Sequence, residues 1–598
     1  MMQLTRFFPR PRYLVAGLGL LVFAALMPTG WYDALPRRTD LPDLPPLPFR
    51  GVDLLRLTVA VQGALLVWLA TRRYAFQRIS NLDLLPEPLP DGADVAGAAR
   101  FTWMLVGVTV LALILRLVAV NADLWLDEIT PILDYGSLPV AQVVGSYLRS
   151  NNHLLNTLLL KAMVALFGEH EWAVRLPAVL FGVATVPALY FVARLALSRA
   201  VSLAAALLLA VSYHHIFFSQ NARGYTAYMF FAVVASGLFV RGLSTDRPST
   251  WTWYVITIFL GFASLLNTLF VGAAHAIVGL IALWVVRRRG GSPKPLLVRL
   301  AWVFGVAGFL GFQLYATALP EMLVIISTVY ASAATGFAPF NSDFLVEITR
   351  GISSGFGPGL LVAAIPFLAV AAAGYVSLTR RHWALTLALT LPGVLTALFL
   401  LVRGLTFSPR FFLLWLPLAI MAAAQGVWLT GDVAARLFRR QTTTGATNTG
   451  ARIAGGVLAA LTVVSLLALP NYYRTPKQPY RAALSHLDSL RGPGDRIAVI
   501  FTAEKGVKYY LDRAGADESA YAFVRSSAAF DSLRADPRTR RIIVLTTFRR
   551  ALRIRIPDLH AEIERGWTPE HVFPGTVGDG SIIVWLPKSA PLHATRSQ

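Results

Sequence analysis

The sequence predicts a polytopic α-helical membrane protein that ends in an extracytoplasmic α/β domain. Hydrophobic residues make up 56% of the chain and charged residues only 14%, whereas soluble domains carry about 25% charged residues. Apolar runs long enough to cross roughly 30 Å of hydrocarbon recur along most of the sequence. After Pro470 the composition becomes rich in Arg, Asp and Pro, and the apolar runs are too short to span.

The apolar runs divide the chain into three parts. Residues 1–100 hold two N-terminal spans and a cytoplasmic loop, 101–470 form the membrane core with a long external loop at 121–173, and 471–598 form the last domain. An anchored first helix is favoured over a cleaved signal peptide, because further spans follow it. We expect about thirteen spans, at 13–27, 52–70, 101–120, 174–193, 201–218, 225–240, 251–266, 268–286, 300–319, 358–378, 383–402, 411–430 and 453–469.

The basic residues predict the orientation of the chain. Its formal net charge is +22, but Arg gathers in short loops of one side, which the positive-inside rule assigns to the cytoplasm. No aromatic and basic platform supports nucleic-acid binding. The N-terminus is therefore expected in the cytoplasm, and the external loop and the C-terminal domain outside. The loops that carry this argument include Arg72, Arg73, Arg287, Arg288, Arg289, Arg380 and Arg381.

Two adjacent carboxylates, Asp127 and Glu128, follow the span at 101–120. Carboxylates are costly in hydrocarbon, so a pair at a membrane exit is either solvated or part of a site. One of them can act as a general base while the other orients a neighbour or holds a cation. The alternative is a helix start, because acids before Thr130-Pro131 complement an N-terminal dipole. Residue type alone does not decide between them.

The external loop itself contains helical patterns. Val140, Val143, Val144 and Tyr147 recur at helical spacing, and a second apolar stretch covers 154–167. Both are expected to lie in the membrane interface and to roof a cavity beside the acidic pair; a single re-entrant span is the alternative. His153 precedes the second stretch, where it is either a phosphate or metal ligand or part of a helix cap.

Four arginines lie at predicted outer ends of helices: Arg175, Arg223, Arg403 and Arg410. The guanidinium group suits bidentate phosphate recognition and is costly near hydrocarbon without a partner. If several converge, they form an anion site at the outer leaflet. The alternative is that each extends to lipid headgroups. The chain has no cysteine, which excludes thiolate catalysis and Cys-based metal sites.

The C-terminal domain shows short apolar β-rich runs with helical patterns between them. The runs are 496–501, 542–547 and 581–586, and a helix is expected over 482–490 before Gly492-Pro493-Gly494. This alternation predicts a small α/β domain of its own.

Five ordered motifs within about residues 101–430 resemble the GT-C glycosyltransferases that use polyprenyl-phosphate sugars. The nearest group comprises the bacterial protein O-mannosyltransferase-like enzymes, including the lipid A aminoarabinose and galacturonic acid transferases. The motifs are Asp127-Glu128, Asn152-His153-Leu154-Leu155, Phe167-Gly168-Glu169 with Val174-Arg175-Leu176-Pro177, Ser219-Gln220-Asn221-Ala222-Arg223-Gly224-Tyr225, and Arg410-Phe411-Phe412-Leu413.

The resemblance implies a membrane glycosyltransferase of the cell (inner) membrane with a periplasmic or extracellular active site. It implies a sugar donor on polyprenyl phosphate and a lipid, glycan or protein acceptor. Asp127 is then the general base, and Glu128 supports it or, with His153, binds a divalent metal. Substrate contacts are expected from His153, Arg175, Arg223, Tyr225, Arg403 and Arg410. Relatives often have a His where Asn267-Thr268 stands here, which argues against a metal cluster.

Two other function classes compete with this interpretation. A transporter or flippase could use the same acids and arginines, but carriers place polar residues near the bilayer midplane, at broken helices. Here the acids and most of the arginines lie at one predicted interface, which favours an enzyme. A membrane scaffold for the outer domain leaves the arginine group unexplained.

Overall fold

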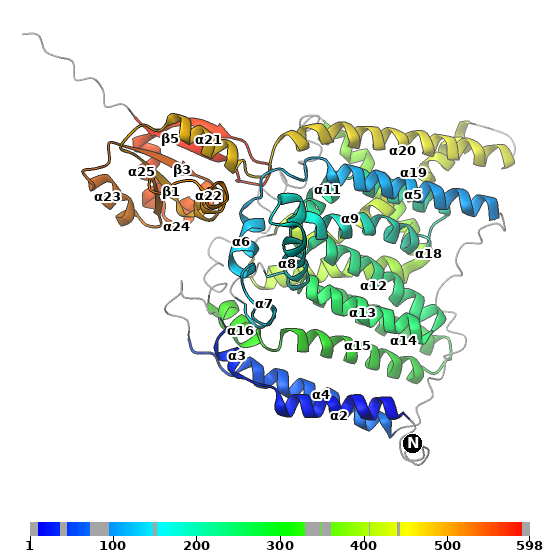
Figure 1. Cartoon of the computed structure of the whole chain (residues 1–598). Helices are drawn as coiled ribbons and strands as arrows, with labels where there is room; N and C mark the ends of the chain where they lie inside the picture. The colour runs from blue at the N-terminus through cyan, green and yellow to red at the C-terminus, as the bar shows by residue number, and fades with distance from the viewer. Residues whose placement is uncertain are drawn as a thin grey trace, which may run out of the picture. The chain divides into compact units, whose positions relative to one another are not determined.

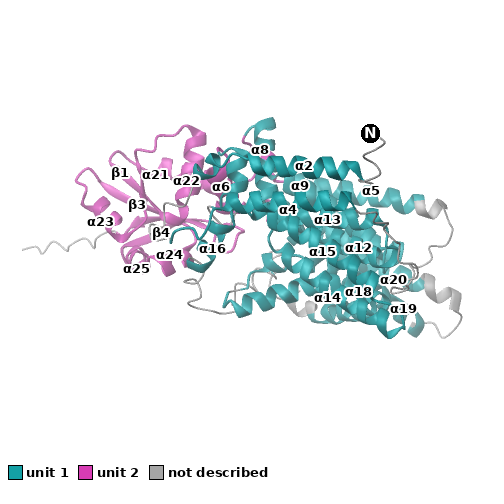
Figure 2. Cartoon of the chain, turned by 90° about the horizontal axis from the view of Figure 1, so that it is seen from below, with its two compact units in different colours: residues 1–117, 138–168, 174–467 teal, residues 118–137, 169–173, 468–598 magenta. Residues whose placement is uncertain are grey.

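The computed structural model describes residues 10–35, 45–71, 95–147, 152–328, 349, 360–405, 407–438 and 443–588. They divide into two compact units (Figure 2): unit 1 comprises 1–117, 138–168 and 174–467, and unit 2 comprises 118–137, 169–173 and 468–598. Arg72 and Arg73 lie outside the described residues.

Unit 1 is helical, and Figure 1 shows its long helices α12, α13 and α15 side by side. The most deeply buried is α12, which lies at the centre of a large apolar core. The helices with residues in this unit are α2 (Pro11–Leu26), α3 (Gly30–Asp33), α4 (Gly51–Ala70), α5 (Val95–Leu117), α7 (Val140–Gly145), α8 (Leu154–Phe167), α9 (Glu171–Ala193), α10 (Arg199–Val211), α11 (Tyr213–Ser219), α12 (Tyr225–Thr245), α13 (Pro248–Ser264), α14 (Thr268–Arg288), α15 (Lys294–Tyr315), α16 (Leu319–Thr328), α18 (Leu360–Val402), η2 (Pro409–Phe412), α19 (Trp415–Phe438) and α20 (Thr443–Arg474).

The predicted class of multi-pass membrane protein is confirmed. Within the described part of the chain, nine helices are long and apolar enough to span a bilayer, and the bent pair α10–α11 makes a tenth. Each of the thirteen predicted segments falls on a helix, so the lower count has identifiable causes. The helices α2 and α13 have only 16 and 17 residues, and α18 covers two predicted segments.

The long helix α18 is broken in its middle. Its 43 residues include His382, whose φ of −152° and ψ of 70° are not helical. A continuous helix of that length would extend about 65 Å, twice the hydrocarbon thickness. The break separates the predicted spans 358–378 and 383–402. Residues 358 and 359 of the first span lie outside the described residues.

Unit 2 contains a five-stranded sheet with the order β2-β1-β3-β5-β4. The strands β1, β2 and β3 are parallel, with Ile497 beside Tyr521 and Ile543, and β5 and β4 add antiparallel at one edge. The strand β1, the middle one of the three parallel strands, is almost wholly buried, as expected of a parallel strand covered on both faces. The elements are α6 (Leu126–Tyr135), α21 (Tyr480–Leu490), β1 (Asp495–Ile500), α22 (Phe501–Ala514), β2 (Tyr521–Val524), α23 (Ser527–Ala535), β3 (Arg541–Thr546), α24 (Arg549–Arg555), α25 (Pro557–Gly566), β4 (Trp567–Phe573) and β5 (Ile582–Pro587).

The helical patterns of the external loop are present as short helices. The first is α7, which ends at Gly145, before Tyr147. The second is α8, whose bounds are those of the predicted apolar stretch. Their position in the membrane interface stays a prediction.

Candidate functional site

The turn between α11 and α12 places a buried cation beside a histidine in unit 1. Arg223 is only 4% exposed, and its guanidinium carbon lies 5.1 Å from the ring centroid of Tyr225, the first residue of α12. One of its terminal nitrogens, Nη2, lies 3.1 Å from Nε2 of His153. The ring of His153 in turn meets the ring of Tyr225 edge-on at 5.3 Å. Three of the predicted substrate contacts therefore form one cluster.

The hydrogen bonds of His153 decide what this cluster can bind. The backbone N–H of Gly224 donates to Nδ1 of His153 over 3.0 Å. A neutral imidazole that accepts at Nδ1 carries its proton on Nε2. The Nε2–H group and the guanidinium of Arg223 are then both donors, and they cannot bond to each other. Two converging donors of this kind are suited to a shared anionic acceptor.

Arg410 adds a second positive charge to this cluster. It lies in η2, with its guanidinium carbon 5.3 Å from the ring centroid of Phe411. Burial, and then the charges of Arg223 and Arg410, hold the pKa of His153 well below its usual value of 6.5. The imidazole is therefore neutral at physiological pH, and the net charge of the cluster comes from the two arginines.

Gly224 is required at this turn by a close approach of its backbone. A Cβ at this position would lie 2.4 Å from the carbonyl oxygen of Ser264 and 2.8 Å from Nδ1 of His153. Both neighbours are held in place, since Ser264 ends α13 and His153 precedes α8. Only glycine lets the turn bring its N–H to the imidazole.

Gly224→Ala is therefore expected to displace His153 and to destabilise unit 1 by about 1–3 kcal/mol. The lower thermal unfolding temperature in detergent should be accompanied by weaker binding of polyprenyl phosphate. Gly272→Ala is the matched control, because a Cβ at Gly272 in α14 meets nothing within 4 Å. If both variants unfold and bind alike, the close approach does not matter.

A fully buried arginine of α5 joins the end of α10 to the end of α11, the helix that precedes this turn. The guanidinium group of Arg116 donates to the carbonyl of Ala210 and to the hydroxyl of Ser219, both over about 3 Å. Its own carbonyl accepts from the side chain of Gln220 at 2.9 Å. A helix end leaves backbone carbonyls without helical partners, and Arg116 supplies donors where α10 ends and α11 follows.

Arg116→Met is expected to lower the stability of the protein by about 3 kcal/mol, because buried carbonyls lose charged donors. Thermal unfolding in detergent measures this loss. Arg100→Met is the control, since Arg100 is an exposed arginine of the same helix. Equal unfolding temperatures for the two variants would show that Arg116 does not hold the turn.

The other two predicted arginines have different surroundings. Arg175 is 2% exposed in α9, one turn before Ala178, whose carbonyl accepts from the Thr226 hydroxyl at 3.0 Å. Arg403 is exposed just after α18, where Gly404 takes a φ of +62° and ends the helix. Their roles as substrate contacts stay predictions.

The acidic pair lies in unit 2, at the start of α6. Asp127 is the second residue of this helix and is half-buried. Glu128 is the third and is fully buried, and its Oε2 accepts the backbone N–H of Trp125 over 3.2 Å. This is the reaching-back half of a capping box. The helix-start geometry is therefore present, and for Glu128 it occupies one carboxylate oxygen.

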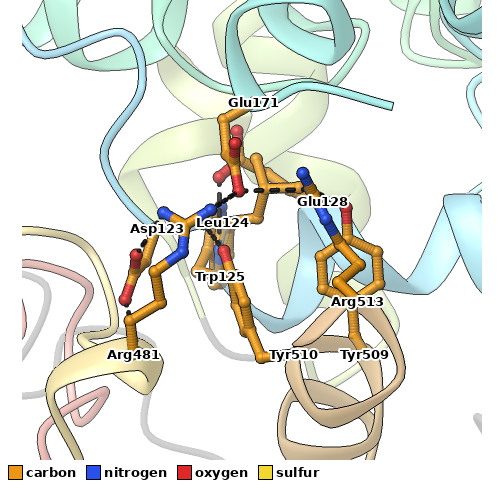
Figure 3. A network of polar contacts seen from close by, with 9 residues as sticks. All are labelled: Asp123, Leu124, Trp125, Glu128, Glu171, Arg481, Tyr509, Tyr510 and Arg513. Atoms are coloured by element: carbon orange, nitrogen blue, oxygen red, sulfur yellow. Dashed lines mark hydrogen bonds and ion pairs between the residues drawn. The ribbon is translucent and has the colours of Figure 1, made fainter. Parts of the chain in front are cut away.

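Unit 2 also contains a polar network that the sequence did not predict (Figure 3). Arg481 of α21 forms ion pairs with Asp123 and Glu171. Arg513 of α22 reaches the same oxygen of Glu171 over 3.2 Å, and burial raises the pKa of Asp123 despite its pair with Arg481. In the sequence, these contacts are indicated only by the position of two acids, Asp123 and Glu171, near the two ends of the external loop.

The two predicted metal ligands do not suit a divalent ion. Glu128 already accepts from Trp125 and lies 3.7 Å from Nζ of Lys477, while Nδ1 of His153 is occupied by Gly224 and its Nε2 faces a guanidinium. A cation at His153 would be repelled by Arg223. Nor do three or more His, Asp or Glu side chains gather as metal ligands anywhere in the described ranges.

The family described as dolichyl-phosphate-mannose-protein mannosyltransferase has a model that matches residues 154–312. The matched range contains Arg175, Arg223 and Tyr225, and the match confirms the resemblance expected from the motifs. No curated protein matches this chain.

Three solved structures are similar to the chain at low sequence identity. ArnT from Cupriavidus metallidurans bound to undecaprenyl phosphate is 13% identical, with 82% of this chain and 99% of that chain covered and a TM-score of 0.46. The oligosaccharyltransferase AglB from Archaeoglobus fulgidus, in complex with an inhibitory peptide and a dolichol-phosphate, is 13% identical. The match covers 84% of this chain and 76% of that chain, with a TM-score of 0.46. The arabinosyltransferase EmbB from Mycobacterium smegmatis is 14% identical, with 73% of this chain and 47% of that chain covered and a TM-score of 0.39.

Proposed function

We propose that this chain is a membrane glycosyltransferase that moves a sugar from a polyprenyl-phosphate donor to an acceptor hydroxyl of a lipid, glycan or protein. The observation that carries the proposal is the convergence of the Nε2–H of His153 and the guanidinium of Arg223, with Arg410 close enough to depress the pKa of the imidazole. This arrangement suits a phosphate group. The family-model match over 154–312 supports the same substrate class.

The chemistry assigns a role to each charged group. The acceptor oxygen attacks the anomeric carbon, and its proton passes to Asp127 as general base. The bond between that carbon and the phosphate oxygen breaks with inversion, and the oxygen keeps the electron pair. Arg223 and Arg410 stabilise the charge on the departing lipid phosphate. Arg175, Arg403 and Tyr225 are proposed as further donor contacts, and no step requires a metal.

The proposed location is the cell (inner) membrane, with the N-terminus in the cytoplasm and Asp127 outside. The chain has no native cysteine, so a single cysteine at position 127 can be labelled by an impermeant maleimide on intact cells. Labelling from outside is expected. Labelling only after the membrane is opened would show that position 127 faces the cytoplasm and that the proposed orientation is wrong.

Transfer of label tests the function against the transporter alternative. Membranes containing the protein are incubated with radiolabelled polyprenyl-phosphate sugars and an extract of candidate acceptors. A glycosyltransferase moves the label from the lipid donor to a new product. Movement of the intact labelled lipid across the membrane, with no bond cleaved, would instead support a flippase.

A further inference from the structure

The start of α6 is held by side chains from the C-terminal part of unit 2. The backbone N–H of Leu124 donates to the hydroxyl of Tyr510 over 2.6 Å, and the backbone N–H of Leu126 donates to Oε1 of Gln478 over 2.7 Å. Glu128 lies 3.7 Å from Nζ of Lys477. Every second residue of the segment 124–128 thus contacts a side chain of the C-terminal part of unit 2.

These contacts supply the part of the helix cap that the N-cap side chain of α6 cannot provide. The first backbone N–H groups of a helix have no helical partner, and a Ser, Thr, Asp or Asn at the N-cap usually accepts from them. The N-cap of α6 is Trp125, whose indole has no acceptor. Gln478, which follows Leu126 by 352 residues in the chain, accepts from the first N–H group of α6 instead. Without it, the helix start would lose the acceptor that orients it.

The ion pair between Lys477 and Glu128 adds a second constraint. The two side chains are 5% and 0% exposed, and a buried charge that loses its partner is strongly destabilising. Gln478 is itself fully buried, and its amide nitrogen donates to the hydroxyl of Thr547 over 3.0 Å. The acceptor for Leu126 is therefore fixed to the end of β3 and cannot rotate freely.

We propose that Lys477, Gln478 and Tyr510 are positioning residues that set the place of Asp127, and that the C-terminal domain is for this reason required for the chemical step. The inference rests on the proposed function, in which Asp127 is the general base. Asp127 lies between two residues that the C-terminal domain holds, Leu126 and Glu128. A displacement of a catalytic group by about 1 Å can cost on the order of 100-fold in rate.

Two substitutions test this proposal with little change in shape. Tyr510→Phe removes the acceptor of Leu124 but keeps the ring that stacks on Tyr480 at 5.8 Å. Lys477→Met removes the charge opposite Glu128 and keeps the length of the side chain. Each is expected to lower kcat about 10- to 100-fold. Binding of polyprenyl phosphate should keep its Kd and its stoichiometry, because the His153 cluster belongs to unit 1.

Two controls separate positioning from a general loss of structure. Tyr521→Phe removes a hydroxyl from β2 of the same domain and should leave kcat unchanged. Lys477→Arg restores the charge and should recover most of the rate lost in Lys477→Met. Lower binding stoichiometry in the Tyr510 and Lys477 variants would point to unfolding and would overturn the proposal.

The outcomes also separate this inference from the proposed function. If the wild-type protein transfers no sugar, the proposed function fails. If the wild type is active and both Tyr510→Phe and Lys477→Met keep its kcat, the glycosyltransferase assignment stands and the positioning role is wrong.

Discussion

Asp127→Asn is expected to lower kcat for sugar transfer by about 10²- to 10⁴-fold, which is the usual contribution of a positioned general base. The amide is close in shape to the carboxylate but cannot accept the proton of the acceptor hydroxyl. Binding of polyprenyl phosphate should be unchanged, because the substitution leaves the cationic cluster of unit 1 intact. Steady-state kinetics and equilibrium binding with the purified variant measure both quantities.

The matched control for this variant is Asp53→Asn. Asp53 also lies in the first turn of a helix, α4. An acid there stabilises a helix by about 0.3–1 kcal/mol through its dipole, so the helix-start interpretation predicts a similar small loss of stability in both variants. Only the general-base role predicts loss of kcat at Asp127 alone. Full activity of Asp127→Asn would contradict that role.

Arg223→Gln is expected to raise the Kd for polyprenyl phosphate about 10- to 100-fold. A hydrogen bond to a charged group contributes about 1.5–3 kcal/mol, and each 1.4 kcal/mol corresponds to a factor of ten in Kd. Arg223→Lys should recover little of the affinity, because an ammonium group lacks the planar fork of guanidinium. Titration with the lipid phosphate in detergent micelles gives these constants.

Arg241→Gln is the control for this titration, because Arg241 is an exposed arginine of α12. It removes the same charge from the helix that follows the turn of Arg223, so a general electrostatic attraction of the lipid would weaken both variants equally. A specific anion site predicts a change only at Arg223. Equal affinities of wild type and Arg223→Gln would remove the main support for the proposed donor.

The membrane helices were predictable because each carries its own pattern. In lipid, the backbone N–H and C=O groups of an apolar run of about 20 residues must hydrogen-bond to one another as a helix. The length and composition of the run are therefore sufficient to predict the helix. The break of α18 at His382 falls between two predicted spans, but the bend within the predicted span 201–218 was not predictable in the same way. The bend between α10 and α11 depends on donors from Arg116, which lies 94 residues before its acceptor Ala210.

The strands of unit 2 show the same division between local and distant causes. β1, β3 and β5 were predicted, because buried strands read as apolar runs. The strand β2 has only four residues, and β4 contains Pro569 and is mostly exposed. A short strand and an edge strand with proline lack an apolar run, so their pairing with neighbours defines them.

The candidate site also contains residues that local motifs predict and residues that only distant contacts define. The predicted residues His153, Arg223, Tyr225 and Arg410 come together in unit 1, and the motif around Arg223 could be recognised from its sequence alone. The need for Gly224 could not, because it depends on Ser264 and His153 approaching one backbone atom. The contacts of Lys477, Gln478 and Tyr510 with the segment 124–128 also join residues more than 300 positions apart, and no local pattern reveals them.

The most direct test of the glycosyltransferase assignment is a single turnover with a doubly labelled donor. The polyprenyl-phosphate sugar carries ³H in the sugar and ³²P in the phosphate, and the purified wild-type protein is mixed with acceptor and donor. Cleavage of the bond between the anomeric carbon and the phosphate oxygen predicts that ³H moves to the acceptor while ³²P stays with the lipid. Joint movement of both labels, or their continued presence together on the lipid, would contradict the assignment.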